Sequence, residues 1–464
     1  MATRDDRTPD SPFRAPPPAA PAWPATGRPN AAPPAPRAAP ARPVPRPPVT
    51  APASAAPERP STAPVPVDAP RPPPPPSRIE YFAPCTLGVE AALTAELAEL
   101  GAQEISTRPG GVSFVGDRRL GYAANLWLRS AVRVQDLLLR APARGKDELY
   151  DAVYRIDWAR HMRLDQTLAV DASVRDSELT HSNFVGLTVK DAIVDQFRTR
   201  MGRRPSVNVD APDLPLKVVL KSNGVTIWRN LSGESLHKRG YHALQVKSPL
   251  NEATAAGLLR LAEWDRASPL VDPMCGSGTF LIEAAMLAAE HAPGLERRFA
   301  FERWPDFDGG LWATLRAEAR ARARSTLPFA IEGADRHGGA VSIAERSAHQ
   351  AGVADLVRFT VADAARWTPA CSLAPDGGAP PPFTVLCNPP YGERIGEGDD
   401  LVASWRALGR FLAERCRGAR AFVLCGNREM LRHVGLDTLR QFSVMNGQLE
   451  CRLLEYDLRE PRFT

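Results

Sequence analysis

Two short segments of the 464-residue chain combine residue types that could carry out chemistry. In the first, Asp272-Pro-Met-Cys-Gly-Ser-Gly-Thr279, an acid follows an apolar pair and precedes a glycine-rich turn. In the second, Cys387-Asn-Pro-Pro-Tyr391, a carboxamide, two prolines and an aromatic ring follow another apolar run. The first segment could hold a cofactor and the second a planar amine beside it. Together they predict the transfer of a small group to a nucleobase.

The first segment suits a ligand that carries both a carboxylate and an amine. Gly276 and Gly278 would let the backbone approach a ligand closely. Thr279 and the N–H groups that follow it would cap a helix and meet a carboxylate, and Asp272 would meet an amine. S-adenosylmethionine (SAM) has both groups, and the loop is neither G-x-G-x-x-G nor a phosphate loop. A tight strand-to-helix turn without a ligand is the alternative interpretation.

Two further acids are expected at the ends of strands. Asp335 would accept hydrogen bonds from both ribose hydroxyls, as an acid after the second strand does in dinucleotide sites. Asp363 could accept from an adenine amino group. Each could instead be a helix N-cap. Glu332 competes with Asp335, but its place inside the expected strand makes it the poorer candidate.

The Asn388-Pro-Pro-Tyr391 motif is suited to activating an exocyclic amine, whose lone pair is delocalised into the base. The side-chain oxygen of Asn388 and the carbonyl of Pro389 could each accept one amine hydrogen and stabilise the charge that develops on nitrogen. The prolines would fix these acceptors in place. Tyr391 could stack on a flipped-out base. A rigid exit from a strand is the alternative interpretation.

After Ala253, the strands and helices that must position these residues are expected to alternate along the sequence. Apolar strands are expected at Leu270–Val271, Phe329–Ile331, Val357–Val361, Val385–Cys387 and Ala421–Leu424, alternating with helices, which is typical of a doubly wound parallel sheet. A segment at 287–328 is longer than a usual crossover. A hairpin around Asn446-Gly447 is expected to close the chain.

The rest of the chain divides into a module and a tail. Residues 78–231 mix strands with helices, such as Leu87–Leu100 and Val189–Phe197, and contain a hairpin at Asn223-Gly224. They predict an α+β module, and residues 232–464 the catalytic domain. Residues 1–77 hold 27 of the 47 prolines and are expected to be disordered.

Composition limits the possible classes of protein. The net charge of +5 includes +4 from the tail, which has nine Arg and five acids, so the overall charge is weak evidence for nucleic-acid binding. No apolar run is long enough to span a bilayer. The seven cysteines form no C-x-x-C pair, which suits a reducing cytoplasm and predicts no metal site. An organelle transit peptide is the alternative for the Arg-rich N-terminus.

Four other segments have two interpretations each. His237-Lys-Arg-Gly-Tyr241 and the cluster of Arg198, Arg200, Arg203 and Arg204 could contact RNA backbone or be structural. Asn251-Glu252 could face the cofactor or cap a helix. Arg316–Arg324 could be a patch that contacts RNA, but its sequence more closely fits a solvated helix face.

From about residue 79 the chain resembles the THUMP-containing class I RNA methyltransferases, in particular the RlmL family of 23S ribosomal RNA guanine-N2 methyltransferases. The matching stretches are Leu236–Tyr241, Leu270–Thr279, Leu281–Met286, Ala292–Leu295, Asn388–Arg394, Asn446-Gly447 and Cys451, together with the segment at 287–328 and a THUMP-like helix at Val189–Val194. The family has Lys-Glu where this chain has Asn251-Glu252.

The resemblance implies a class I, Rossmann-like SAM-dependent methyltransferase domain behind a ferredoxin-like plus THUMP module, residues 78–231, that presents structured RNA. Guanine N2 would be the acceptor, held by Asn388 and Tyr391, with Pro389 beside them. The loop residues Asp272, Pro273, Cys275, Gly276, Gly278 and Thr279, with Asp335 and Asp363, would hold SAM, although the Cys275 thiol is expected only to pack. The family's bifunctional members carry a second methyltransferase half, and a single activity is expected here.

The expected function is therefore methylation of ribosomal RNA in the cytoplasm. Three alternatives are open. A tRNA guanine-N2 methyltransferase is one, because THUMP modules also serve tRNA enzymes. An adenine-N6 DNA methyltransferase is another, because the motif suits any planar amine, although a THUMP-like module argues against DNA as a partner. A non-catalytic RNA-binding assembly factor is the third.

Overall fold

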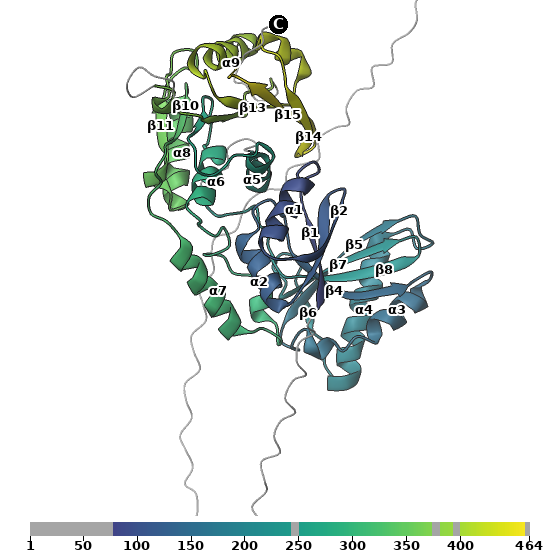
Figure 1. The fold of residues 1–464 in the computed structure, drawn as a ribbon. Helices are drawn as coiled ribbons and strands as arrows, with labels where there is room; N and C mark the ends of the chain where they lie inside the picture. The colour runs from purple at the N-terminus through teal and green to yellow at the C-terminus, as the bar shows by residue number, and fades with distance from the viewer. Residues whose placement is uncertain (1–77, 243–249, 374–380, 393–399, 460–464) are drawn as a thin grey trace, which may run out of the picture. The chain divides into compact units, whose positions relative to one another are not determined.

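The structure is a computed structural model that describes residues 78–242, 250–373, 381–392 and 400–459. The expected disorder of residues 1–77 and the Glu393-Arg394 part of the family motif therefore lie outside the described residues. Two sheets organise the described chain, one of eight strands and one of seven (Figure 1). Both belong to one unit, Pro72–Thr464. Within the described ranges, no helix combines the length and the apolar character that crossing a membrane requires.

The first sheet builds the N-terminal α+β module in the strand order β2-β3-β1-β4-β8-β7-β5-β6. The predicted hairpin turn is present, with Ser222 at φ 50° and Asn223 at φ 59°, the left-handed pair that a tight two-residue turn requires. The elements are β1 (Ile79–Pro84), α1 (Glu90–Glu99), β2 (Gln103–Arg108), β3 (Gly111–Gly116), α2 (Arg118–Trp127), β4 (Gln135–Pro142), α3 (Lys146–Tyr154), β5 (Thr167–Arg175), α4 (Ser182–Met201), β6 (Ser206–Val207), β7 (Leu214–Lys221) and β8 (Gly224–Asn230).

The second sheet has the order β11-β10-β9-β12-β13-β15-β14, which confirms the predicted α/β class. Its first five strands are parallel, and β14 and β15 form the predicted antiparallel hairpin around Asn446-Gly447. The elements are α5 (Glu252–Leu261), β9 (Leu270–Asp272), α6 (Thr279–Ala288), α7 (Gly309–Arg322), β10 (Ile331–Asp335), α8 (Gly338–Gln350), β11 (Arg358–Val361), β12 (Thr384–Cys387), α9 (Leu401–Arg415), β13 (Arg420–Cys425), β14 (Arg440–Asn446) and β15 (Leu449–Asp457). Short 3₁₀ turns occupy Trp158–Arg160, Ala300–Arg303, Ala354–Leu356, Ala370–Ser372 and Arg428–His433.

The direction of chain travel reverses between β9 and β12. From β9 the chain passes to β10 and β11 on one side, then returns to β12 and β13 on the other. Ligands of open α/β sheets bind outside the carboxyl ends of the strands at such a reversal. The two segments that opened the sequence analysis follow these two strands, so the topology brings them to the same edge.

Several predicted boundaries were wrong for identifiable reasons. The helix expected from Leu87 begins at Glu90, because Gly88 has φ 97° and cannot continue a helix. The strand expected at Phe329–Ile331 begins at Ile331 and runs to Asp335. Strand β2 was not predicted, because its sequence, Gln-Glu-Ile-Ser-Thr-Arg, has exposed polar side chains on both faces and no apolar alternation.

A buried arginine joins the module to the segment at 287–328. Arg229, at the end of β8, donates from Nε to Asp136 Oδ1 at 3.0 Å and from Nη1 to Asp306 Oδ2 at 3.1 Å. Its guanidinium lies 4.4 Å from the centre of the Trp304 ring. Burial alone would lower the pKa of Arg229, but the two carboxylates outweigh that effect and raise it. The segment is therefore attached to the module through a charged group that is only 10% exposed.

Candidate functional site

Four strand ends bring the predicted residues together. Asp335 ends β10 opposite Val361 of β11, and Gly333 pairs with Asp272 at the end of β9. On the other side of β9, Val385 pairs with Val271, so Asn388 follows β12 at the same edge. Asp363 comes two residues after β11. The structure therefore gathers the four polar residues that the sequence placed at strand ends along one edge of the sheet.

Asp272 is a buried acid without a cationic partner among the described residues. Its side chain is 2% exposed and accepts a hydrogen bond from the Met274 N–H at 3.1 Å. Burial, with a smaller contribution from the charge of Asp335, raises the pKa of Asp272 to about 8. A carboxyl group in this state gains most from an incoming ammonium, which would return it to the ionised form. The α-amino group of SAM fits this requirement.

The glycine turn between β9 and α6 leaves open space next to the backbone. Gly276 has φ 54°, and a side chain there would meet nothing within 4 Å. Gly278, at φ 77°, is the N-cap of α6, and a Cβ there would approach the Phe359 ring to 2.9 Å. No side chain caps α6, so the prediction that Thr279 caps the helix was wrong, because Thr279 is its first residue. The uncapped N–H groups of the first turn can meet a carboxylate.

Asp335 is better placed than Glu332 to meet a ligand. Asp335 is half-buried, and its carboxylate accepts hydrogen bonds from the N–H groups of Gly276 and His337, both at 2.9 Å. Glu332 is 3% exposed and already bound to Arg358 at 3.2 Å and to the Ala370 N–H at 2.8 Å. Glu332 is thus engaged inside the fold, whereas Asp335 lies at the strand end and braces the glycine turn.

Asp363 is exposed and forms a turn of its own. Its Oδ1 accepts the N–H of Ala365 at 2.8 Å, and its carbonyl accepts from Arg366 and Trp367. This is a side-chain turn and not the helix N-cap that was the alternative interpretation, because the structure has no helix directly after Asp363. Beside it, Val361 is 58% exposed, and this apolar surface at the end of β11 could cover one face of a planar ring. Nothing in the sequence marks Val361 as a site residue, because a valine that ends a strand is normally buried.

The loop after β12 is anchored so that one carbonyl stays available. Pro390 accepts a hydrogen bond from Trp405 Nε1 at 2.9 Å, and Tyr391 accepts from Asn427 Nδ2 at 3.4 Å. The carbonyl of Pro389 accepts none from any residue that the structure describes. Trp405 and Asn427 were missed by sequence reasoning, because they lie on α9 and beyond β13 and no local pattern marks them.

Tyr391 is bound to Asn388. Its hydroxyl donates to Asn388 Oδ1, and burial raises the pKa of Tyr391 well above its ordinary value, so the hydroxyl keeps its proton. A side chain at Gly426 would come within 2.9 Å of the Tyr391 ring, so one part of the ring is covered. A carboxamide oxygen has two lone pairs, so Asn388 can accept a second hydrogen from a ligand.

The cysteines of the site are packed rather than reactive. Cys275 is 7% exposed and donates its N–H to the Ala334 carbonyl at 2.9 Å, and Pro273 beside it is also buried. Burial raises the pKa of the Cys275 and Cys387 thiols well above the ordinary value. Throughout the described ranges, no group of three or more His, Cys, Asp or Glu residues is arranged to hold a metal ion.

The segments with two interpretations are mostly structural. Arg239 and Tyr241 are 2% exposed and bind the buried Glu283 of α6, at 3.3 and 3.0 Å, so these two side chains pack inside the fold instead of facing RNA. Arg239 also donates to the Arg129 carbonyl of the module at 2.5 Å. Asn251 caps α5 through the N–H groups of Ala253 and Thr254. Arginines of both basic clusters bind acids within the fold: Arg322 and Arg324 bind Glu290, Arg200 binds Asp157, and Arg204 binds Asp195.

Three protein-family models match successive parts of the chain. Residues 80–135 match the RlmL ferredoxin-like domain, residues 143–228 the THUMP domain, and residues 239–455 the RMKL-like methyltransferase domain. The first two matches cover strands of a single sheet.

Relatives of known description match over most of the chain. The ribosomal RNA large subunit methyltransferase K/L of Syntrophotalea carbinolica is 41% identical over 393 residues, which are 83% of this chain and 54% of that protein. A Synechocystis protein described as a candidate RNA methyltransferase is 38% identical over 379 residues, 82% of this chain and 96% of that protein. The chain thus spans about half the length of the K/L relatives it matches.

Solved structures show the same architecture. The candidate methyltransferase SMU.472, solved in complex with S-adenosylhomocysteine (SAH), has a TM-score of 0.74 and 29% identity, covering 83% of this chain and all (100%) of that one. A Listeria monocytogenes protein, named from its sequence as an N6-adenine-specific DNA methylase, has a TM-score of 0.71 and 30% identity, covering 82% and 96%. The names of these relatives differ in substrate, while the fold is shared.

Proposed function

Since the chain belongs to the THUMP-containing, SAM-dependent RNA methyltransferases of the RlmL family, we propose that it methylates the exocyclic N2 of a guanine in 23S ribosomal RNA. The observation that carries the proposal is the anchored loop after β12. It presents Asn388 and the carbonyl of Pro389, which accepts no hydrogen bond from the described residues, at the same sheet edge as Asp272. Two acceptors fit a guanine amino group, which has two hydrogens.

The chain's own residues would act by orientation. SAM supplies a methyl group on a positively charged sulfur. Asn388 and Pro389 would each accept one amine hydrogen, so that the nitrogen lone pair points at the methyl group and its developing charge is stabilised. Transfer forms the N–C bond as the S–C bond breaks, and the cationic amine then releases one proton to solvent. Tyr391 would hold Asn388 in place from one side and the base from the other.

On the cofactor side, the same edge offers one group for each part of SAM. Asp272 would bind the ammonium, the first turn of α6 the carboxylate, and Asp335 the ribose hydroxyls. Asp363 and the exposed Val361 would lie against the adenine. Pro273, Cys275, Gly276, Gly278 and Thr279 would shape this surface through their backbone and packing.

The raised pKa of Asp272 predicts that SAM affinity depends on pH. Below its pKa of about 8 the carboxyl is protonated, and binding an ammonium must release that proton, so affinity should rise about tenfold per unit from pH 6 to 8. Above about pH 8 the amino group of SAM itself deprotonates and affinity should fall. Isothermal titration of the full chain with SAM from pH 6 to 9 measures this profile. Asp272→Asn should lose the rise and keep the fall; an unchanged rise would contradict the assignment.

The proposed reaction is tested with purified protein, labelled SAM, and transcripts of 23S RNA and tRNA. Digestion to nucleosides should give labelled N2-methylguanosine from 23S RNA. Label in tRNA alone would favour the tRNA alternative, and N6-methyladenine in a DNA control would favour the function named for the Listeria relative. If SAM does not bind, the assembly-factor alternative gains support.

The remaining assignments complete the proposal. Residues 78–231 would present the RNA, residues 232–464 would carry out the transfer, and the enzyme would work in the cytoplasm, where ribosomal RNA is its partner.

A further inference from the structure

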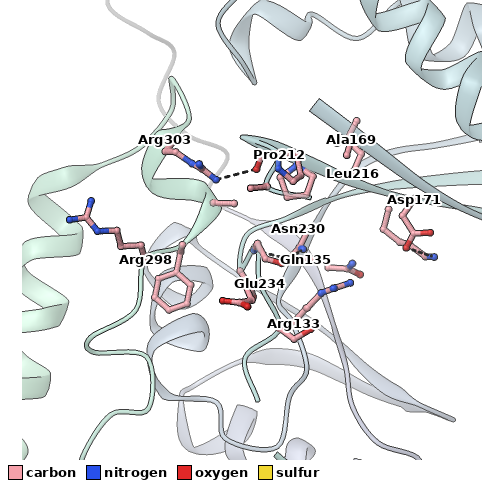
Figure 2. A pocket seen from close by; sticks show the side chains of 18 of the residues that line it. Arg133, Gln135, Ala169, Asp171, Pro212, Leu216, Asn230, Glu234, Arg298 and Arg303 are labelled. Carbon is pink, nitrogen blue, oxygen red and sulfur yellow. Dashed lines mark hydrogen bonds and ion pairs between the residues drawn. The ribbon is translucent and has the colours of Figure 1, made fainter. Parts of the chain in front are cut away.

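A cavity of about 910 Å³ lies apart from the candidate site, against the first sheet (Figure 2). Its walls come from the strands β5 and β7, from the start of β4, from residues 230–238 after β8, and from Arg298–Phe307. No residue proposed to bind SAM or the target amine lines it. Its volume is in the range of ligand pockets, about 300 to 1,000 Å³.

Gln135 presents at this cavity a carboxamide that no described residue binds. The side chain is 5% exposed and lines the cavity, and its carboxamide makes no hydrogen bond to any residue that the structure describes. Its oxygen and nitrogen are not among the fully enclosed polar atoms, so they reach the cavity and can bind a ligand there. A carboxamide offers both donors and an acceptor, which is the combination that matches the edge of a nucleobase.

Arg133 supplies the matching positive charge. It is half-buried and lines the cavity, its Nε is buried without a hydrogen-bond partner, and across the described ranges it forms no ion pair. Of the four other cations of the lining, three are already bound to acids: Lys217 to Asp171, Lys238 to Glu234, and Arg303 to Asp213. The fourth, Arg298, is exposed, whereas Arg133 is half-buried. A guanidinium without a partner is suited to bidentate contact with a phosphate.

The balance of charge limits the size of the occupant. Asp171 and Glu234 also line the cavity, so it is not the continuous basic surface that a duplex backbone requires. At the rim, Val209 is 76% exposed and lies near Pro212, so an apolar surface is available for the face of a base. The cavity thus offers one contact for a phosphate, one for the edge of a base and one for the face of a base. This set of contacts fits a single unpaired nucleotide.

We propose that this cavity binds one unpaired nucleotide of the RNA substrate, with Arg133 on its phosphate and Gln135 on its base edge. The proposal rests on the proposed function in taking RNA as the substrate. Because Arg298–Phe307 belongs to the segment that Arg229 attaches to the module, both parts of the chain would contact that nucleotide. The nucleotide would therefore fix the position of the RNA relative to the catalytic sheet.

The test is fluorescence anisotropy on the full chain, with a labelled single-stranded RNA of about 12 nucleotides as the probe. Arg133→Ala and Gln135→Leu should each weaken binding about tenfold, the size expected for a lost charged or buried hydrogen bond. Arg133→Ala should also reduce the slope of log affinity against log salt by about 0.7, while Arg133→Lys should retain most of the slope. The matched control is Arg406→Ala, because Arg406 is exposed on α9 and has no ion pair within the described ranges.

Each outcome decides the proposal. SAM titration confirms that each variant is folded. If Gln135→Leu does not fold, the salt slopes of Arg133→Ala and Arg133→Lys still decide the proposal. Wild-type affinity and salt slope in the Arg133 and Gln135 variants would overturn the proposal, as would equal losses with Arg406→Ala or equal binding of the same RNA as a duplex. The anisotropy assay does not measure methyl transfer. If the Arg133 and Gln135 variants lose RNA affinity but the wild type modifies no guanine in the separate methylation assay, the proposed function alone is contradicted.

Discussion

Asn388→Ala is expected to lower kcat about 10²- to 10³-fold while leaving SAM affinity within about threefold of wild type. This decrease in kcat is the size expected when an enzyme loses one positioned hydrogen-bonding group that stabilises the charge developing in the transition state. Asn388 lies beyond β12, whereas the residues proposed to bind SAM follow β9, β10 and β11. Single-turnover methylation and isothermal titration with SAM separate the two effects.

Two variants make this result interpretable. Tyr391→Phe keeps the ring but removes the hydroxyl that donates to Asn388, so kcat should fall only about tenfold. Asn183→Ala changes an exposed asparagine of α4 and should leave kcat unchanged. Near-wild-type turnover by Asn388→Ala would contradict the proposed role of the amide.

The second large effect is expected on stability. Arg229→Ala should lower the free energy of unfolding by about 3 to 5 kcal/mol, because it leaves the buried Asp136 without its cation. Asp136 is 6% exposed and has Arg229 as its ion-pair partner in the described part of the chain. Chemical denaturation of the full-length protein, followed by tryptophan fluorescence, measures the change.

Arg140→Ala is the matched control. Arg140 binds Glu80 on the same sheet, but its side chain is 49% exposed, and exposed pairs contribute about 0 to 1 kcal/mol. The free energy of unfolding of Arg229→Lys should lie between those of the two alanine variants, since lysine keeps the charge but cannot make the bidentate contact of a guanidinium. Equal midpoints for Arg229→Ala and Arg140→Ala would show that burial of the pair is unimportant.

The residues that meet at the edge of the second sheet could be predicted, because the sequence patterns that mark them are local. Strand, acid and glycine turn follow one another in sequence around Asp272, and parallel strands place such ends together whatever the details of the core. Asp335 was preferred over Glu332 on position alone, and the contacts of Glu332 with Arg358 and Ala370 give the reason. The hairpin was predicted around Asn223-Gly224 by the same local logic, although its two turn residues are Ser222 and Asn223 and Gly224 already begins β8.

Contacts between distant positions could not be predicted. Arg229 and Asp136 are 93 residues apart, and their pairing depends on β4 lying beside β8, which no single-sequence pattern indicates. Trp405 reaches the Pro390 carbonyl from a helix whose own sequence marks only a buried face. Gln135 gave no signal either, because a polar residue at the start of a strand is expected to be solvated.

The most direct test of the central claim is a comparison of modified nucleosides between a deletion strain and its parent. Purified 23S RNA and tRNA from both strains would be digested with nuclease and analysed by mass spectrometry. The account predicts that one N2-methylguanosine is lost from 23S RNA, that Asn388→Ala fails to restore it, and that tRNA is unchanged. Loss of N2-methylguanosine from tRNA alone, with 23S RNA intact, would contradict the account.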